Sequence, residues 1–233
     1  LEPGLRTVFY NAYNELAPQY STVFHIKSSK KHAEYELGMG NFTPWVERVN
    51  ETDNVTYQKF EEGLERMYVH SEFASGFMIG KRLYEDELYN IINKMPEDLG
   101  RAGRTKVETD AATVFNNAFS VNGYDGVPLI AENHPLVSSQ DVASNQINGA
   151  LSDITLKQAI TLMRSTTDEA GKKVVLRPDI LVVPPALEWY ATELLKSPHI
   201  VDSANNNINS LAGRLKLFVY DYLEDDDSWF VMD

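Results

Sequence analysis

Cysteine is absent from this chain of 233 residues. Disulfide bridges and thiolate-ligated metal sites are therefore excluded, which agrees with a reducing compartment. The sequence also lacks any run of about 18 apolar residues and any basic-then-apolar amino terminus, so it predicts neither a membrane span nor a signal peptide. We expect a soluble protein.

Positive charge is also scarce, because 21 Lys and Arg face 34 Asp and Glu for a formal net charge of -13. Proteins that grip nucleic acid use clustered Lys and Arg to displace counterions, so DNA near this protein is expected to be enclosed rather than read. The one basic cluster holds Arg101, Arg104 and Lys106. Gly100 and Gly103 lie too close together for a nucleotide-binding phosphate loop. A solvated or inter-subunit face is the preferred interpretation.

Motifs of catalysis and metal binding are missing as well. The five histidines show no HExxH spacing, and no G-x-S-x-G elbow occurs. The acidic segment Glu224 to Asp227 lacks the spacing of a calcium loop and is interpreted as a solvated hairpin tip. His134 is expected to make a structural hydrogen bond rather than act as a base. We therefore predict no enzyme activity, no cofactor and no metal, and interpret Trp189 and Tyr190 as core or subunit-contact residues.

What the sequence does contain is enough apolar material for a core, at 43% hydrophobic residues. Helical spacing near the amino terminus, ending at Pro18, predicts a short helix on an arm. Residues 41 to 80 mix aromatic and charged side chains in extended stretches around the polar turn Asn50 to Asn54. This pattern predicts a long β-hairpin that projects from the body and finds apolar partners on another molecule.

The segment from Leu83 to Phe119 has helical periodicity. Pro96 is expected to restart the helix, because proline suits the first helical turn. The small residues Gly100 and Gly103 indicate that another backbone approaches closely. The predicted apolar stripe of this long helix consists of Leu99, Gly103, Val107, Ala111, Val114, Phe115 and Ala118.

The remaining residues predict a compact α+β unit. Asn122-Gly123 and Asp125-Gly126 are typical of tight turns with positive φ angles. A capping box at Thr155 and Gln158 would open a helix. Further along the chain the pattern predicts strands at 174–176 and 180–183, a helix that ends before Pro198, and two terminal strands joined by the acidic turn.

Five segments in this order resemble the Mu-type major head subunits of tailed bacteriophages. They are GLRTVFYNAY, MPEDLGRAG, YDGVPLIAENHPL, LVVPPALEWYATELL and NSLAGRLKLFVYDYLEDDDSWFVMD. The resemblance implies the Hong Kong ninety-seven type capsid fold, an α+β fold. It further implies an amino-terminal arm at 1–41, an extended loop with its return strand at 42–80, a peripheral domain with a spine helix at 81–151, and an axial domain at 152–233. Because Mu-type subunits continue beyond the last hairpin, we expect a longer parent subunit.

The function implied by the resemblance is structural. Copies of the chain would form pentamers and hexamers of an icosahedral head around double-stranded DNA, with portal, scaffold and decoration proteins as partners and without a membrane. Two alternatives stay open: an encapsulin-like compartment of the same fold, and a soluble hydrolase with a site built from scattered residues. The inter-subunit contact residues are predicted to be Trp45, Arg48, Tyr57, Phe60, Gly100, Arg101, Gly103 and Arg104.

Overall fold

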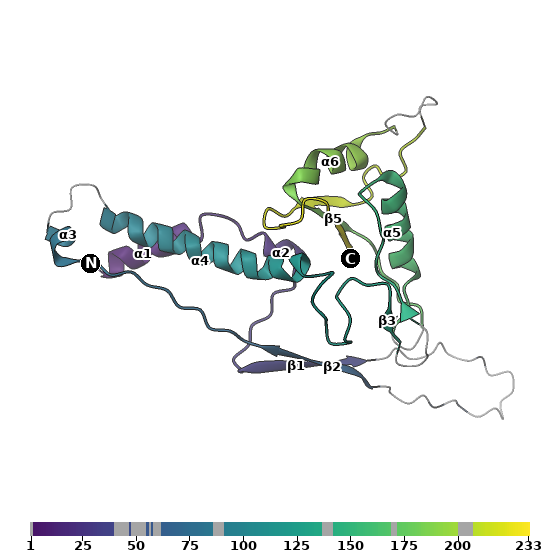
Figure 1. Ribbon diagram of the computed structural model, residues 1–233, viewed down its shortest axis with the longest axis horizontal. Helices are drawn as coiled ribbons and strands as arrows, with labels where there is room; N and C mark the ends of the chain where they lie inside the picture. The colour runs from purple at the N-terminus through teal and green to yellow at the C-terminus, as the bar shows by residue number, and fades with distance from the viewer. Residues whose placement is uncertain are drawn as a thin grey trace. The chain divides into compact units, whose positions relative to one another are not determined.

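The computed structural model describes residues 2–39, 47, 55, 57, 62–85, 91–136, 142–168, 172–199 and 207–233 (Figure 1). The chain divides into two compact units. We call residues 1–30 together with 70–115 the helical unit, and residues 31–69 together with 116–233 the sheet unit. No helix in the described part of the chain is long and apolar enough to cross a membrane.

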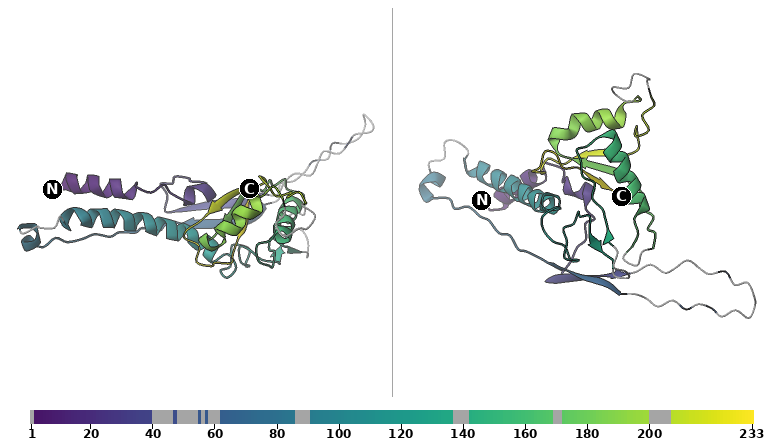
Figure 2. Two further views of the ribbon diagram at one scale, coloured as in Figure 1. Left: turned by 90° about the horizontal axis from the view of Figure 1, so that it is seen from above. Right: turned by 45° about the vertical axis from the view of Figure 1, so that its right-hand side comes forward.

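Four helices lie in the described residues of the helical unit. The arm supplies α1 (Glu2–Tyr13) and the one-turn α2 (Tyr20–Val23). The later segment supplies α3 (Lys81–Glu85) and the long α4 (Ile91–Asn116). Helix α1 runs alongside α4 in all views (Figures 1 and 2). The predicted arm helix and its termination before Pro18 are confirmed.

Helix α4 is continuous for 26 residues with Pro96 inside it. The expected restart at Pro96 was therefore wrong. Proline removes only the hydrogen bond to the carbonyl four residues earlier, which is that of Ile92, near the start of the helix. Its ring is fully buried, and the packing of that ring offsets the lost bond.

The buried face of α4 also differs from the predicted stripe. Val107 and Val114 are exposed, whereas Arg104 and Glu108 are buried. The packed face follows a four-residue step because the arm brings backbone polar groups to the helix. These groups need hydrogen-bond partners, which Arg104 and Glu108 supply. The buried residues are Ile92, Pro96, Gly100, Arg104, Glu108, Ala112 and Phe115. Of the predicted stripe, Phe115 and Ala118 are buried.

In the sheet unit, β1 (Ala33–Met39) and β2 (Glu62–Val69) form an antiparallel pair. A strand within the predicted hairpin segment is confirmed by β2, whereas its partner β1 lies in the segment predicted as the arm, where alternation of apolar and charged residues starts at Ala33. The predicted turn at 50–54 lies outside the described residues. The ladder has an irregularity between Leu37 and Met39.

A compact loop follows α4. The backbone N–H of Gly123 donates to the carbonyl of Val127 at 2.7 Å, and Gly126 has a φ of 84°. The positive φ predicted for the Asp-Gly turn is thus confirmed, while Gly123 is absent from the positive-φ region. The short strands β3 (His134–Pro135) and β4 (Val142–Ala143) pair antiparallel beyond it.

The core of the sheet unit lies around a three-stranded sheet of order β6-β5-β7. Strand β5 (Ile180–Val183), predicted from its apolar run, pairs in parallel with β6 (Lys216–Val219) and antiparallel with β7 (Phe230–Met232). Helices α5 (Asp153–Ser165) and α6 (Glu188–Lys196) pack onto it, and η1 (Pro185–Leu187) precedes α6. The buried cluster comprises Leu151, Leu156, Ile160, Leu181, Val183, Ala191, Leu195, Leu211 and Leu215.

Three local predictions for this unit were wrong. The terminal strands do not pair with each other, because the apolar β5 requires a partner along both edges and takes the place between them. Residues 174–176 form no strand, and Val175 is exposed before Arg177-Pro178. The capping box of α5 uses Ser152 and Thr155 instead, since the Ser152 hydroxyl accepts the Thr155 N–H at 3.2 Å.

Candidate functional site

Helices α4 and α1 approach each other closely at Gly100. A Cβ placed there would lie 2.6 Å from the Phe9 carbonyl oxygen and 3.1 Å from the backbone nitrogen of Tyr13. At Gly103 a Cβ would meet only the Tyr13 ring, at an ordinary 3.6 Å. The predicted close backbone approach is therefore confirmed at Gly100, and the segment that approaches is the arm of the same chain.

Arg104 anchors the end of α1. Its Nε donates to the Tyr13 carbonyl at 3.0 Å, and its guanidinium lies 4.2 Å from the centre of the Tyr13 ring. A second N–H reaches the Asn14 side-chain oxygen at 3.5 Å. Only 8% of the surface of Arg104 is exposed, so its side chain is buried against the arm. The guanidinium fork satisfies a helix-end carbonyl that α1 leaves without an intrahelical donor.

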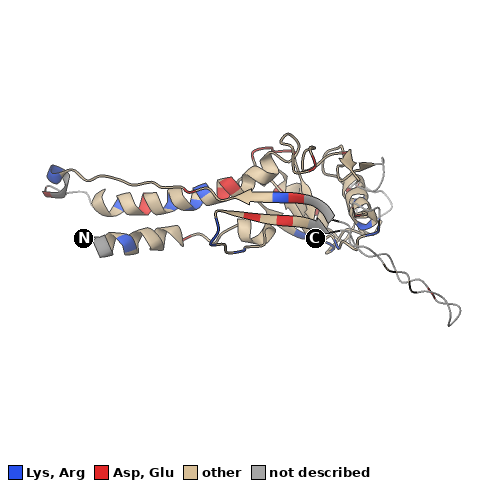
Figure 3. Cartoon of the chain, turned by 90° about the horizontal axis from the view of Figure 1, so that it is seen from below, with Lys and Arg blue, Asp and Glu red and all other residues tan. Residues whose placement is uncertain are grey.

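Arg101, one turn earlier, stays at the surface. Its Nε contacts the Glu15 carboxylate at 3.0 Å, and Asp98 lies 3.8 Å from another guanidinium nitrogen. The hydrogen bond with Glu15 and its charge raise the pKa of Arg101. Acidic and basic residues are interspersed along α4 (Figure 3). Residues 100–106 are helical throughout, so they do not form a phosphate-binding loop.

Glu108 is the functional residue that sequence reasoning missed. Its carboxylate accepts the backbone N–H of Gln19 at 2.8 Å and that of Tyr20 at 3.0 Å. Only 2% of its surface is exposed. The four-residue step from Gly100 through Arg104 to Glu108 could have signalled that these polar residues share the packed face of α4. Together they attach the arm to the helix.

The β1–β2 pair has one apolar and one charged face. Residues two apart along a strand share a face, so Tyr35, Leu37, Met67 and Val69 lie on one face, where Tyr35 pairs with Met67, Ala33 with Val69, and Leu37 with Glu65. All four are about half exposed or more, Tyr35 at 62%. The opposite face carries Arg66, whose guanidinium lies 4.7 Å from the ring of its neighbour Tyr68.

The charged face of this pair is the one turned toward the rest of the sheet unit. Arg66 also lies 5.6 Å from the ring of Tyr124 in the loop after α4. The pair consequently presents its apolar face to solvent, the reverse of a ribbon that packs on its own core. Of the predicted contact residues, Tyr57 is 90% exposed, whereas Trp45, Arg48 and Phe60 lie outside the described residues.

A polar network holds the loop after α4. His134 Nδ1 lies 2.6 Å from the Asp125 carboxylate, and its Nε2 lies 3.2 Å from the Asn145 side-chain oxygen. Asn145 accepts the Ala131 N–H and donates to the Leu129 carbonyl, each within 2.9 Å. His134 thus makes the structural hydrogen bonds predicted for it. No three His, Asp or Glu side chains gather as a metal site in the described ranges.

Helix α6 exposes aromatic side chains as well. Trp189 is 76% exposed and Tyr190 is about half exposed, while Ala191 and Leu195 face the core. Of the two interpretations of Trp189, the core residue was therefore wrong, and the subunit contact stays a prediction. The helix buries the face defined by positions 191 and 195, and position 189 falls on the other side.

Comparison with known proteins gives two family matches. Residues 1–153 match the family described as Mu-like prophage major head subunit gpT, and residues 81–233 match the family described as phage capsid protein. The major capsid protein of Escherichia phage Mu is 38% identical over 77 residues, which cover 33% of this chain. The match spans 25% of the length of that relative.

Solved structures of bacteriophage JBD30 have a similar fold. A chain of the JBD30 capsid decorated with minor capsid protein trimers superimposes with a TM-score of 0.70 at 16% identity, covering 90% of this chain and 92% of its own length. A chain of the JBD30 procapsid gives a TM-score of 0.64 at 14% identity, covering 94% and 97%. The likeness establishes an α+β fold of the phage capsid type.

Proposed function

Because the chain belongs to the family of Mu-like prophage major head subunits, we propose that it is a major capsid subunit of a tailed bacteriophage or prophage. Its copies associate into pentamers and hexamers of an icosahedral shell. The shell encloses double-stranded DNA, and the net charge of -13 suits enclosure without sequence-specific binding. The site of action is the virion, assembled in the host cytoplasm.

One observation carries this proposal, namely the outward apolar face of the β1–β2 pair. Tyr35, Leu37, Met67 and Val69 are exposed together on one face of the ribbon. Burying a side chain of this size contributes about 1.5–3 kcal/mol, so four of them, each already partly covered, would supply several kcal/mol to a contact between copies. Tyr57, farther along the same hairpin, would extend the contact.

The subunit divides into functional parts in our proposal. The arm is 1–41, the extended loop with its return strand is 42–80, the peripheral domain with α4 as spine helix is 81–151, and the axial domain is 152–233. The extended loop, with Trp45, Arg48, Tyr57 and Phe60, lies over a neighbouring subunit.

The basic cluster on α4 takes part in assembly through the arm. Gly100, Gly103 and Arg104 lie against α1 of their own chain. They therefore contribute to the contact between subunits indirectly, by holding the arm in place. Arg101 is exposed beside Glu15 of its own chain. In our proposal its exposed side also contacts a neighbouring copy.

The subunit has further partners in this proposal. They are a portal, a scaffold and decoration proteins, in analogy with the JBD30 capsid decorated with minor capsid protein trimers. The match to head subunits favours this assignment over the encapsulin-like compartment and the hydrolase.

Electron microscopy of the purified chain tests the proposal. Wild-type protein should form closed shells or ring-shaped capsomers. The double variant Tyr35→Ser/Met67→Ser should remain unassembled at the same concentration, while Tyr68→Ser, on the charged face of the same ribbon, should still assemble. A monomeric wild type under all conditions of salt and concentration would overturn the proposal.

A further inference from the structure

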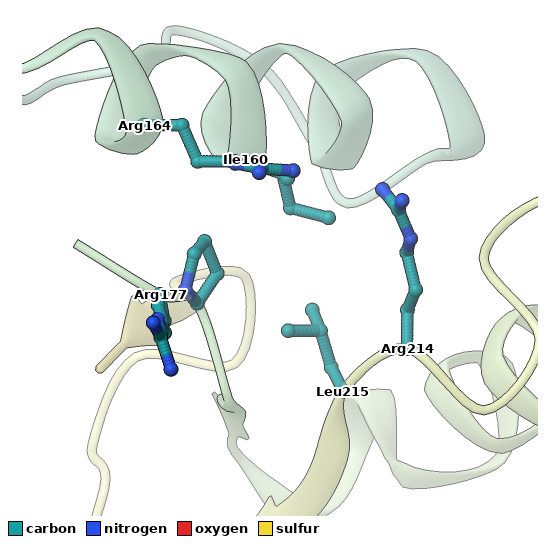
Figure 4. A pocket seen from close by; sticks show the side chains of 6 residues that line it. Ile160, Arg164, Arg177, Arg214 and Leu215 are labelled. Carbon is teal, nitrogen blue, oxygen red and sulfur yellow. The ribbon is translucent and has the colours of Figure 1, made fainter. Parts of the chain in front are cut away.

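The sheet unit contains a pocket of about 270 Å³ between α5 and the segments that enter β5 and β6. Its lining is apolar at Ile160, Pro178 and Leu215, with arginines around them. Arg164 comes from the last turn of α5, Arg177 from the segment before β5, and Arg214 from the segment before β6. In Figure 4 Arg214 extends toward α5, where Arg164 lies along the wall of the pocket.

Three guanidinium groups at one pocket are unexpected in a chain with 34 acidic and 21 basic residues. Within the described part of the chain, none of the three makes an ion pair or a side-chain hydrogen bond. Asp179 is a nearby carboxylate, and it is engaged by Lys216 at 2.7 Å. All three arginines are exposed, so their unpaired positive charges are accessible and the pocket is suited to an anion.

The acidic loop Glu224–Asp227 lies at the other end of the same sheet. Strands β5 and β6 are parallel, so the pocket flanks the amino-terminal ends of both strands. The acidic loop follows the carboxyl-terminal end of β6. Its four consecutive carboxylates have no cationic partner among the described residues. Asp225 accepts hydrogen bonds from the Ser228 hydroxyl and the Asp227 N–H, which shape the loop without neutralising it.

Within one chain, the pocket and the acidic loop are separated by the length of strand β6. Four residues of β-strand span roughly 13 Å, which exceeds the length of an arginine ion pair. An unpaired basic pocket and an unpaired acidic loop at opposite ends of one unit are complementary only between copies. A contact that joins one end to the other end of the next copy is heterologous, and such contacts form rings where the rotation between copies closes.

We propose that the pocket lined by Arg164, Arg177 and Arg214 binds the acidic loop Glu224–Asp227 of a second copy of this chain. The inference rests on the proposed shell assembly and names a contact within its rings. Arginine is suited to this role because its planar fork binds carboxylates with two parallel hydrogen bonds. The contact also reduces the repulsion between neighbouring copies that each carry a large negative charge.

A charge-reversal exchange tests the contact on the full chain. Arg214→Glu and Asp226→Arg are each expected to raise the protein concentration needed for assembly by roughly three- to fivefold, as for the loss of exposed ion pairs. Combining the two changes in one chain should restore assembly to near the wild-type concentration. Lys173→Glu is the matched control, because it makes the same change in net charge at an exposed position outside the pocket.

Disulfide trapping reads the contact itself. The chain has no cysteine, so the double variant Arg214→Cys/Asp226→Cys can form only engineered bridges. Oxidation should produce a ladder of covalent multimers, whereas a mixture of the two single variants should stop at dimers. Glu193→Cys/Asp226→Cys, with its first cysteine on the exposed face of α6, should give no ladder.

The outcomes separate this inference from the proposed function. Shells formed by the wild type, with Arg214→Glu behaving like Lys173→Glu and no ladder, would overturn the contact and leave the capsid function standing. A ladder without shells would support the contact and count against the capsid function. Loss of binding to a short DNA duplex, measured by fluorescence anisotropy, in Arg214→Glu but not in Asp226→Arg would identify nucleic acid as the ligand and overturn the inference.

Discussion

Glu108 in the middle of α4 accepts a hydrogen bond from the backbone N–H of Tyr20 at 3.0 Å, although the two residues are 88 positions apart. The other carboxylate oxygen accepts the N–H of Gln19. These two donors begin α2, where no helical carbonyl is available to them. A single buried carboxylate therefore holds the second half of the arm on the long helix.

Replacing Glu108 should loosen the arm. Glu108→Ala leaves two backbone donors without an acceptor, which we expect to lower the free energy of unfolding by about 2–4 kcal/mol. Urea denaturation followed by circular dichroism measures this loss. Asp110→Ala removes a half-buried carboxylate of the same helix that pairs with the exposed Lys106, and it should cost less than about 1 kcal/mol. Equal losses for the two variants would contradict the role assigned to Glu108.

The two glycines of α4 should respond in opposite ways to alanine. Gly103→Ala adds a methyl group in ordinary contact with the Tyr13 ring and should stabilise the helix by about 1 kcal/mol. Gly100→Ala places the methyl group 2.6 Å from the Phe9 carbonyl oxygen and should destabilise the chain by about 1–3 kcal/mol despite the gain in helix propensity.

The melting temperatures of these two variants provide the measurement. Limited proteolysis of the arm supplies a second readout, because displacement of α1 would expose its backbone to the protease. A Gly100→Ala variant as stable as Gly103→Ala, with an equally protected arm, would be inconsistent with the close approach at Gly100.

The acidic loop should show a pH dependence centred on Asp225. The Ser228 hydroxyl and then the Asp227 N–H lower the pKa of Asp225 from its ordinary 3.8. The pKa of Asp225 is lower in the folded state than in the unfolded state. Asp225 therefore stabilises the fold at pH values above its ordinary pKa, and this stability is lost as the pH falls through the folded-state pKa. Asp225 is almost fully exposed, so the contribution is small.

Ser228→Ala should move the pKa of Asp225 upward, toward its ordinary value. A carbon-13 NMR titration of the side-chain carboxyl measures the change. The control is Asp227→Ala, which replaces the side chain but keeps the backbone N–H at position 227. In this variant the pKa of Asp225 should stay depressed. An unchanged Asp225 titration in Ser228→Ala would contradict the dominant role of the hydroxyl.

Ionic strength should control assembly through net charge. Copies with a charge of -13 repel one another over long distances, and the Debye length shortens from about 30 Å at 0.01 M to about 10 Å at 0.1 M salt. Light scattering should therefore detect more assembly at about 0.1 M than at about 0.01 M. Assembly that is strongest at the lowest salt would show that local ion pairs outweigh the net repulsion.

Much of the architecture could be predicted from local patterns. The apolar run at 180–183 predicted β5, the amphipathic spacing after Pro185 predicted α6, and the extended stretches of aromatic and charged residues predicted a strand where β2 lies. These elements depend on neighbouring residues, because side-chain periodicity alone decides which face can be buried. The small residue at Gly100 also predicted a close backbone approach, which is confirmed.

Other features could not be predicted locally. The burial of Arg104 and Glu108 depends on the arm, whose peptide groups require polar partners from residues about ninety positions away. Strand β5 lies between β6 and β7, because both of these strands pair with the apolar β5 rather than with each other. The sequence pattern predicts each strand separately and does not show which strands pair.

The sequence by itself therefore determined the absence of thiol chemistry, the acidic charge and the resemblance to head subunits, because these follow from residue types and their order. Only the tertiary structure decided which face of α4 meets the arm and which face of the hairpin is left in solvent. It also brought Arg164, Arg177 and Arg214 to one pocket. Each of these depends on contacts between segments distant in sequence, where packing and hydrogen-bond satisfaction outweigh local propensity.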